Sequence, residues 1–188
     1  MLFSQRLHRC FTGAGDRART LGHRAVGCEH VMLSMLGDKH GWPAAFLEER
    51  GVLQLARTGL EELLEAPEWR WGSSTPMSHL EPTPRLMRCI ERAGSIGSDL
   101  GHDAITSEHL LVAFAEDENG ACATLLEGLE SRRPVIEAGM TLMRSEDYFT
   151  GRCVVVDRND VFLGLPILKD GELWLKRPGG RTVRPEDA

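Results

Sequence analysis

The sequence has no long apolar run and no Cys-x-x-Cys pair, and each absence excludes a class of protein. No stretch approaches the roughly 18 apolar residues that a membrane-spanning helix needs. Arg6, His8 and Arg9 interrupt the apolar region that a secretory signal would require. The five cysteines, an odd number, favour a reducing compartment over a disulfide framework. We therefore expect a cytoplasmic protein without a membrane span.

An excess of positive charge and the common catalytic motifs are also absent. The net charge of −6 argues against nucleic acid as the main partner. The chain contains neither a Gly-x-x-x-x-Gly-Lys-Ser/Thr loop, which would cradle a nucleotide phosphate, nor a Gly-x-Ser-x-Gly elbow. We expect no catalytic residues, no cofactor and no enzymatic activity.

One ten-residue signature occurs twice in the chain. Residues 21–30 read LGHRAVGCEH and residues 100–109 read LGHDAITSEH, an offset of 79 positions. The offset holds without a gap across residues 6–48, where about 40 % of the positions are identical to their partners. This agreement indicates a true internal repeat, so a feature that both copies share belongs to the repeating unit.

Apolar residues recur at three- and four-residue steps in both copies, which is typical of amphipathic helices. Gly22 is placed to end the first helix, and Pro43 falls in a first helical turn, where proline is tolerated. Each copy is predicted to form four helices. Their ranges are 3–21, 28–36, 42–50 and 52–65 in the first copy, and 84–99, 107–116, 120–129 and 134–145 in the second.

The pattern changes between the copies and again near the C-terminus. Residues 66–82 are rich in Pro, Ser and Gly and are predicted to be a surface linker, with Trp69 and Trp71 packed onto the helices. After about residue 147 the apolar residues follow a period of two, which is typical of strands. Strands are expected at 153–156, 161–163, 165–169 and 172–176, with a hairpin turn at Asp170-Gly171 and a short further strand at 182–183.

The repeated unit resembles the N-terminal domain of the Clp chaperone family, the Clp repeat found ahead of the ATPase rings of ClpA-, ClpB- and ClpC-type unfoldases. The resemblance is carried by Leu-Gly-His and the following Glu-His in both copies, by Thr83-Pro84-Arg85 and by Glu-Glu-Arg-Gly-Val at 48–52. It covers about residues 1–145.

The resemblance implies a mainly α fold, a tandem pseudo-twofold repeat of two four-helix units, to which the C-terminal pattern adds a small antiparallel β appendage. The expected domains are 1–146 and 147–188. Within the first, repeat one spans 1–65, the linker 66–82 and repeat two 83–146.

In this family the domain receives substrates and adaptors and performs no chemistry. The absence of a nucleotide loop from the sequence leads us to expect a stand-alone module that acts in trans as an adaptor, decoy or regulator. Its expected partners are Clp unfoldase or protease components, or their substrates and adaptors. Two alternatives remain open. The chain could be an accessory protein whose basic β appendage is the docking surface, or an enzyme on a borrowed scaffold.

Glu29 and Glu108 are the candidate ligand-binding carboxylates, because both fall in the first turn of a predicted helix. A carboxylate there also complements the helix dipole, and this structural role is the competing interpretation. The resemblance implies a sharper one, since some ClpC-type domains bind phosphoarginine with such a glutamate and a nearby Ser or Thr. The alignment of the repeats pairs Ser4 with Glu29 and Thr83 with Glu108, and Leu2 stands where some of these proteins have a basic residue.

Four histidines recur at equivalent positions of both copies. They are expected to brace the loop between the first two helices of each repeat through hydrogen bonds. The alternative, a metal site around Cys28, lacks the four well-placed ligands of tetrahedral zinc, so no metal is expected. The loop histidines are His23, His30, His102 and His109.

Overall fold

The computed structural model describes residues 2–66, 80–145 and 148, together with the backbone of 155–156, 162–169, 172–176 and 182–183. Contacts between residues divide the chain into two units, Met1–Met140 and Thr141–Ala188. The predicted linker tryptophans, Trp69 and Trp71, lie outside the described residues.

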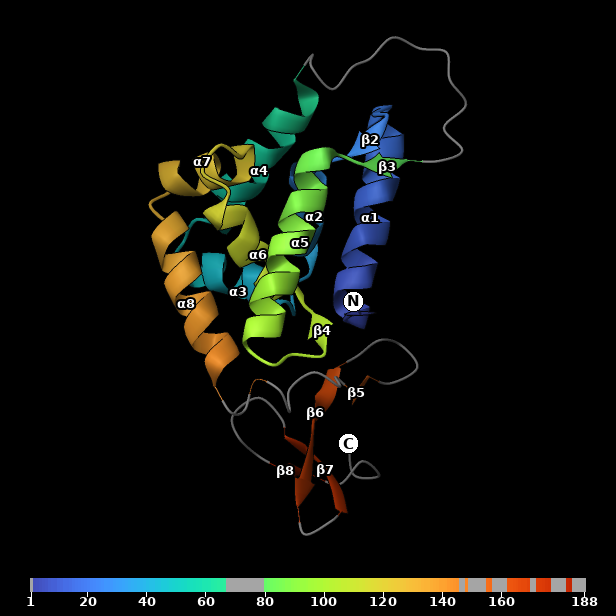
Figure 1. Cartoon of the computed structure of the whole chain (residues 1–188), viewed down its shortest axis with the longest axis vertical. Helices are drawn as coiled ribbons and strands as arrows, with labels where there is room; N and C mark the ends of the chain where they lie inside the picture. Colours follow the sequence, from blue (N-terminus) through green and yellow to red (C-terminus); the bar gives the residue numbers. More distant parts are fainter. Residues whose placement is uncertain are drawn as a thin grey trace. The chain divides into compact units, whose positions relative to one another are not determined.

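Within the described residues, the chain forms eight helices, four in each repeat (Figure 1). All eight predicted helices are present, and most of their ends lie within two residues of the predicted positions. In repeat one they are α1 (Gln5–Leu21), α2 (Cys28–Gly37), α3 (Trp42–Glu49) and α4 (Leu53–Glu65). In repeat two they are α5 (Pro84–Asp99), α6 (Ser107–Glu116), α7 (Ala121–Gly128) and α8 (Arg132–Arg144).

The first helix of each repeat begins and ends with the same local chemistry. Ser4 and Thr83 have the same backbone angles, φ −62° and ψ 152°, and each side chain accepts a hydrogen bond from the N–H three residues later. Gly22 and Gly101 follow with φ of 73° and 70°, a left-handed conformation that glycine adopts without a steric penalty. The internal repeat of the sequence is therefore a repeat of backbone geometry.

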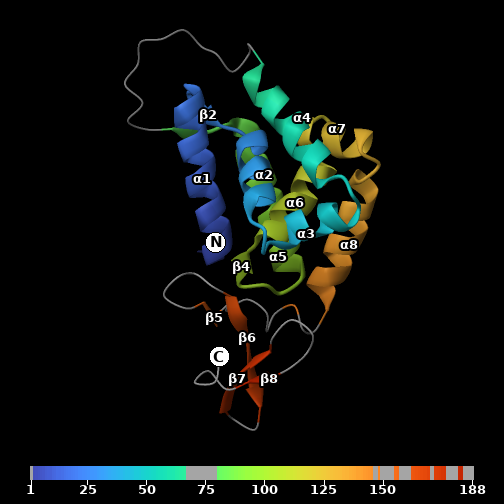
Figure 2. The same cartoon turned by 180° about the vertical axis from the view of Figure 1, so that it is seen from behind.

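The two repeats share one hydrophobic core. Buried side chains from both repeats form a continuous cluster that includes Leu7, Leu60, Leu86 and Phe114. Helices α2 and α6 are buried over most of their lengths, and α2 contacts α5, α6 and α7 of the other repeat (Figures 1 and 2). Because each fully buried large apolar side chain contributes about 1.5–3 kcal/mol, this shared core holds the repeats together.

Two pairs of very short parallel strands also join the repeats, and the sequence analysis did not predict them. Strand β1 (Leu2–Phe3) pairs with β4 (Ala104–Ile105), and β2 (Ala25–Val26) pairs with β3 (Glu81–Pro82). Each pair continues into a hydrogen bond at the helix cap, from Ser4 N–H to Ile105 O at 2.8 Å and from Thr83 N–H to Val26 O at 2.9 Å. The segment before each repeat's first helix is therefore paired with the histidine loop of the other repeat.

The C-terminal unit contains an antiparallel sheet with the strand order β5-β6-β7-β8. Its strands are β5 (Val155–Val156), β6 (Phe162–Lys169), β7 (Glu172–Lys176) and β8 (Thr182–Val183). Lys169 pairs with Glu172, and the hairpin turn predicted between them, Asp170-Gly171, lies outside the described residues. The strands expected at 161–163 and 165–169 are one continuous strand.

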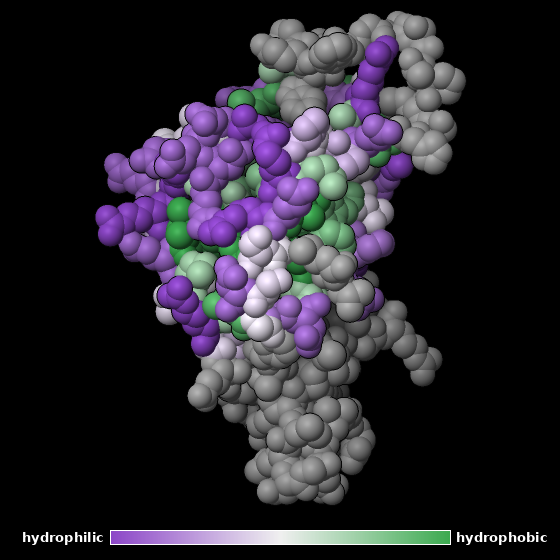
Figure 3. Space-filling view, in the orientation of Figure 1, coloured by the Kyte–Doolittle hydropathy of each residue, from purple (hydrophilic) through white to green (hydrophobic). Residues whose placement is uncertain are grey.

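The exposed surface of the helical unit is largely polar. Figure 3 shows a face on which hydrophilic side chains predominate and apolar side chains reach the surface in separate patches. The large apolar side chains classed as exposed in the described part are Phe3, Leu21, Leu55 and Met87. Among the residues that the structure describes, no helix combines the length and apolarity needed to cross a membrane.

Candidate functional site

The two candidate glutamates occupy equivalent positions at the starts of α2 and α6. Glu29 is the second residue of α2 and is 8 % exposed, whereas Glu108 is the second residue of α6 and is half-buried. Both carboxyl groups lie in a first helical turn, where backbone N–H groups without helical partners favour negative charge. The two candidate hydroxyls, on Ser4 and Thr83, cap α1 and α5.

The structure pairs these groups between repeats, so the predicted pairing within each repeat is wrong. Helix α1 has 17 residues and a length of about 25 Å, and it runs between Ser4 at one end and the loop leading to Glu29 at the other. The exchanged strands instead place Ser4 beside the start of α6, which carries Glu108. They place Thr83 beside the start of α2, which carries Glu29.

Each pairing of a capping hydroxyl with a glutamate is accompanied by an arginine–aspartate ion pair. Arg85 lies two residues after Thr83, and its Nη1 is 2.9 Å from Asp117 Oδ2. Both charges act on the carboxyl group of Glu29. We call Thr83, Arg85, Glu29 and Asp117 the Glu29 site.

The equivalent groups of the other repeat form the Glu108 site, which consists of Ser4, Arg6, Glu108 and Asp38. Arg6 Nη1 lies 3.4 Å from Asp38 Oδ2 and also donates a hydrogen bond to the carbonyl of His40. Sequence reasoning missed the arginines and aspartates of both sites as functional candidates. Their signal was present, because Arg6 and Asp38 are identical to their partners in the second copy.

Burial is the largest influence on the pKa of Glu29. Burial raises the pKa of its carboxyl group and Asp117 adds to the rise, while its own backbone N–H and Arg85 oppose it. A ligand that brings a cation would favour the ionised carboxylate. The Glu29 site therefore combines an acceptor for a cation with an arginine and a helix N-terminus that attract an anion.

The four loop histidines form two hydrogen-bonded pairs with the same geometry. His23 Nδ1 and His30 Nε2 are 2.8 Å apart, as are His102 Nδ1 and His109 Nε2. His30 Nδ1 accepts the N–H of Gly27, and His109 Nδ1 accepts that of Thr106, each at 3.1 Å. Each pair thus connects the loop after the first helix to the start of the second.

The histidine pairs and nearby thiols do not converge on a metal-binding arrangement. In the described part of the chain, no group of three or more His, Cys, Asp or Glu side chains could hold a metal ion. The thiol of Cys28 lies 3.9 Å from the sulfur of Cys89, and His23 and His30 bond to each other.

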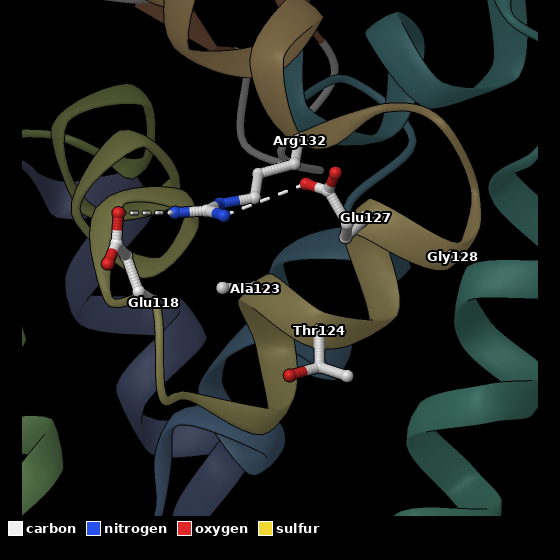
Figure 4. Close-up of a pocket in the computed structure, with 6 residues that line it drawn as sticks. All are labelled: Glu118, Ala123, Thr124, Glu127, Gly128 and Arg132. Atoms are coloured by element: carbon white, nitrogen blue, oxygen red, sulfur yellow. Dashed lines mark ion pairs between the residues drawn. The ribbon is translucent and has the colours of Figure 1, made fainter.

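A separate cavity of about 380 Å³ lies beside α7 (Figure 4). Arg132 extends between Glu118 and Glu127, with a nitrogen 3.6 Å from an oxygen of each, and its Nε donates to Ala115 O at 2.8 Å. These contacts already satisfy the guanidinium, and its bond to Ala115 caps the end of α6. We therefore assign this arginine a structural role. The remaining lining residues are Ala123, Thr124 and Gly128.

Comparisons with known proteins agree with this architecture. The family model described as the Clp repeat (R) N-terminal domain matches residues 2–129. The chaperone protein ClpC of pea chloroplasts and ClpC1 of Arabidopsis thaliana chloroplasts are each 32 % identical to the chain over 128 residues. Each match covers 68 % of this chain but 13 % of the relative, so the chain corresponds to a small part of these proteins.

Solved structures show the same fold at low sequence identity. The N-terminal domain of the caseinolytic protease-associated chaperone ClpD from Arabidopsis thaliana has a TM-score of 0.59 and 19 % identity, covering 76 % of this chain and 95 % of that domain. The Hsp104 N-terminal domain from Candida albicans has a TM-score of 0.58 and 11 % identity, covering 77 % and 93 %. The mainly α, doubly repeated fold predicted from the sequence is confirmed.

Proposed function

Because the chain belongs to the Clp repeat (R) N-terminal domain family, we propose that it is a non-catalytic receptor module of a Clp protease system. It binds substrate segments or adaptors and acts in trans as an adaptor, decoy or regulator. Its partners are Clp unfoldase or protease components, or the substrates and adaptors of those components.

One observation carries this proposal: the same four-residue arrangement occurs twice, each time across the boundary between the repeats. A glutamate from one repeat lies at a helix start beside a capping hydroxyl and an arginine of the other. A purely structural glutamate would need only its own helix N-terminus. The additional arginine and hydroxyl supply groups that can bind a second, negatively charged part of a ligand.

Phosphoarginine on a protein segment fits this arrangement best. Its guanidinium carries donors that match a carboxylate, and its phosphoryl group matches an arginine and helix N–H groups. Thr83 accepts the Leu86 N–H at 3.2 Å through its oxygen, so its own hydroxyl proton is left to donate to a phosphoryl oxygen. The Glu108 site offers Ser4 in the same capping role.

Calorimetric titration of the full chain with free phosphoarginine tests the proposal. Glu29→Gln and Glu108→Gln keep the side-chain shape but remove the charge, and each should weaken its own site about 10- to 100-fold, the cost of losing a charge-assisted bond. Glu91→Gln is the matched control, because Glu91 is exposed on α5 outside both sites. The absence of heat with the unmutated protein would refute phosphoarginine binding.

Affinity purification from cell lysate tests the broader assignment. The full chain should recover Clp components or phosphoproteins, and the double variant Glu29→Gln/Glu108→Gln should lose the phosphoproteins. Recovery of neither class would contradict the receptor assignment. Equal recovery of partners by the wild type and the double variant would show that binding occurs elsewhere, as the alternative with a docking appendage requires.

A further inference from the structure

Two thiols from different repeats meet in the core next to the Glu29 site. Cys28 is the first residue of α2 and Cys89 lies in α5, and each is 4 % exposed. The Cys28 thiol donates a hydrogen bond to the Cys89 sulfur, with the two Sγ atoms 3.9 Å apart. The Cys89 thiol in turn donates a hydrogen bond to Asp117 Oδ2 at 3.9 Å, so the thiol pair contacts a member of the Glu29 site directly.

The pseudo-symmetry provides a comparison within the same molecule. The position equivalent to Cys89 is Cys10, but the position equivalent to Cys28 is Ser107. Ser107 Oγ is buried without a hydrogen-bond partner among the described residues. The Glu108 site therefore has one thiol and one hydroxyl where the Glu29 site has two thiols.

We propose that Cys28 and Cys89 form a reversible disulfide that cross-links the two repeats under oxidation by a small peroxide. The Cys89 thiolate attacks a peroxide oxygen, the O–O bond breaks with loss of hydroxide, and Cys89 becomes a sulfenic acid. The Cys28 sulfur then attacks the Cys89 sulfur, the S–O bond breaks, and water leaves with the Cys28 proton. The two sulfurs lose two electrons in total, and hydrogen peroxide is reduced to two molecules of water once the hydroxide takes up the proton that Cys89 released on forming the thiolate. A dithiol reductant reverses the reaction.

The surroundings assign different roles to the two sulfurs. The hydrogen bond from Cys28 lowers the pKa of Cys89, with Arg85 and Arg88 adding to the effect, while burial and Asp117 oppose it. The same hydrogen bond and burial raise the pKa of Cys28. Because the Cys28 thiol donates to the Cys89 sulfur, we assign Cys89 as the nucleophile and Cys28 as the resolving thiol. Because each side chain is 4 % exposed, the proposal specifies hydrogen peroxide, the smallest peroxide, as the oxidant.

Bond formation would affect the adjacent site. The sulfurs must approach from 3.9 Å to about 2.05 Å. Cys28 directly precedes Glu29, and Cys89 lies one helical turn after Arg85. The disulfide would therefore fix the start of α2 against α5, where the Glu29 site is formed. An effect on ligand binding rests on the proposed function, whereas the cross-link itself does not.

Peptide mapping of the full chain tests the cross-link. The protein is treated with hydrogen peroxide, its remaining thiols are blocked with N-ethylmaleimide, and the digest is analysed by mass spectrometry. We expect a peptide pair joined through Cys28 and Cys89 that disappears after dithiothreitol, together with a rise of several degrees in melting temperature. Cys28→Ser recreates the pair found at Cys10 and Ser107, so it should fold but form no link, whereas Cys10→Ser should still form it.

Three mapping results would overturn the proposal. They are a link that joins Cys89 to another cysteine, over-oxidation of Cys89 while Cys28 stays reduced, and the recovery of both thiols unchanged. In the Glu108→Gln variant, phosphoarginine titration then compares the oxidised and reduced Glu29 site, and we expect at least a threefold change in affinity. If the link forms but neither form binds, the proposed ligand is wrong and the cross-link stands. If phosphoarginine binds but no Cys28–Cys89 link forms, the proposed ligand stands and the cross-link is wrong.

Discussion

Mild acid should destabilise the helical unit through the buried pair His23–His30. His30 is 0 % exposed, and its Nδ1 accepts the Gly27 N–H, so the neutral ring carries its proton on Nε2 and donates it to His23 Nδ1. A second proton on Nδ1 would face the Gly27 N–H, which is itself a donor. Burial, together with the nearby His23 and Arg17, lowers the pKa of His30 from 6.5 to about 4. The unfolded chain therefore takes up a proton that the folded protein resists.

The size and direction of the effect follow from these pKa values. Above about pH 6.5 both states leave His30 neutral and its contribution to stability is fully present. As the pH falls from 6.5 toward 4, the unfolded state is protonated first and the free energy of unfolding decreases. Between pH 7.5 and pH 5, the pKa values of 6.5 and about 4 correspond to a loss of about 2 kcal/mol in the free energy of unfolding. Relaxation of the protein around the new charge reduces the expected loss to about 1–2 kcal/mol.

Urea unfolding at pH 7.5 and pH 5 measures this loss, and His30→Gln isolates its origin. Glutamine at the third helical position can accept the Gly27 N–H and donate to His23, but it does not titrate. The variant should lose about 1 kcal/mol less than the wild type between the two pH values. His8→Gln, at an exposed position of α1, should behave like the wild type. Equal losses for wild type and His30→Gln would refute the reasoning.

Three further predictions concern substitutions to or from glycine at single positions. Glu130 is held at φ 51° where Gly51 of the first repeat has φ 72°, so Glu130→Gly should raise the free energy of unfolding by about 0.5–1 kcal/mol in urea titrations. Gly97→Ala should raise the free energy of unfolding by a similar amount, because alanine has the higher helix propensity. The new Cβ would lie 3.6 Å from its nearest neighbour, His109 Nε2, which is an ordinary contact. Gly139→Ala should lower the free energy of unfolding by about 1–3 kcal/mol, because that Cβ would lie 2.6 Å from Val112 Cγ2. A change in the free energy of unfolding of the opposite sign for any of these variants would contradict the reasoning for that position.

The helices could be predicted from the sequence because their signals are local. Apolar periodicity, the glycine after Leu21 and the proline at Pro43 each act within a few residues of the boundary they define. The least accurate boundaries were the starts of α1 and α8, each two residues from the predicted position. Pro134 was expected to begin α8, but the helix starts at Arg132 and has the proline in its first turn.

The pairing between repeats could not be read in the same way. The strands β1 to β4 have two residues each, too few for any period, and their partners lie in the other repeat. The candidate glutamates and hydroxyls were found because they recur, but recurrence does not tell which copy supplies each partner. The length of α1 was sufficient to reject the pairing of Ser4 with Glu29, since the helix separates its two ends by about 25 Å.

The reciprocal strands have a consequence for how such a chain could arise. A single repeat would present an unpaired leading segment and an unpaired histidine loop, each shaped to complete a neighbour. Two identical half-length chains could therefore form an isologous homodimer. In such a dimer the leading segment of each chain pairs with the histidine loop of the other, so each contact occurs twice. Gene duplication and fusion would then convert the dimer into one polypeptide while preserving its interface, and would free each half to change independently, as Cys28 and Ser107 have done.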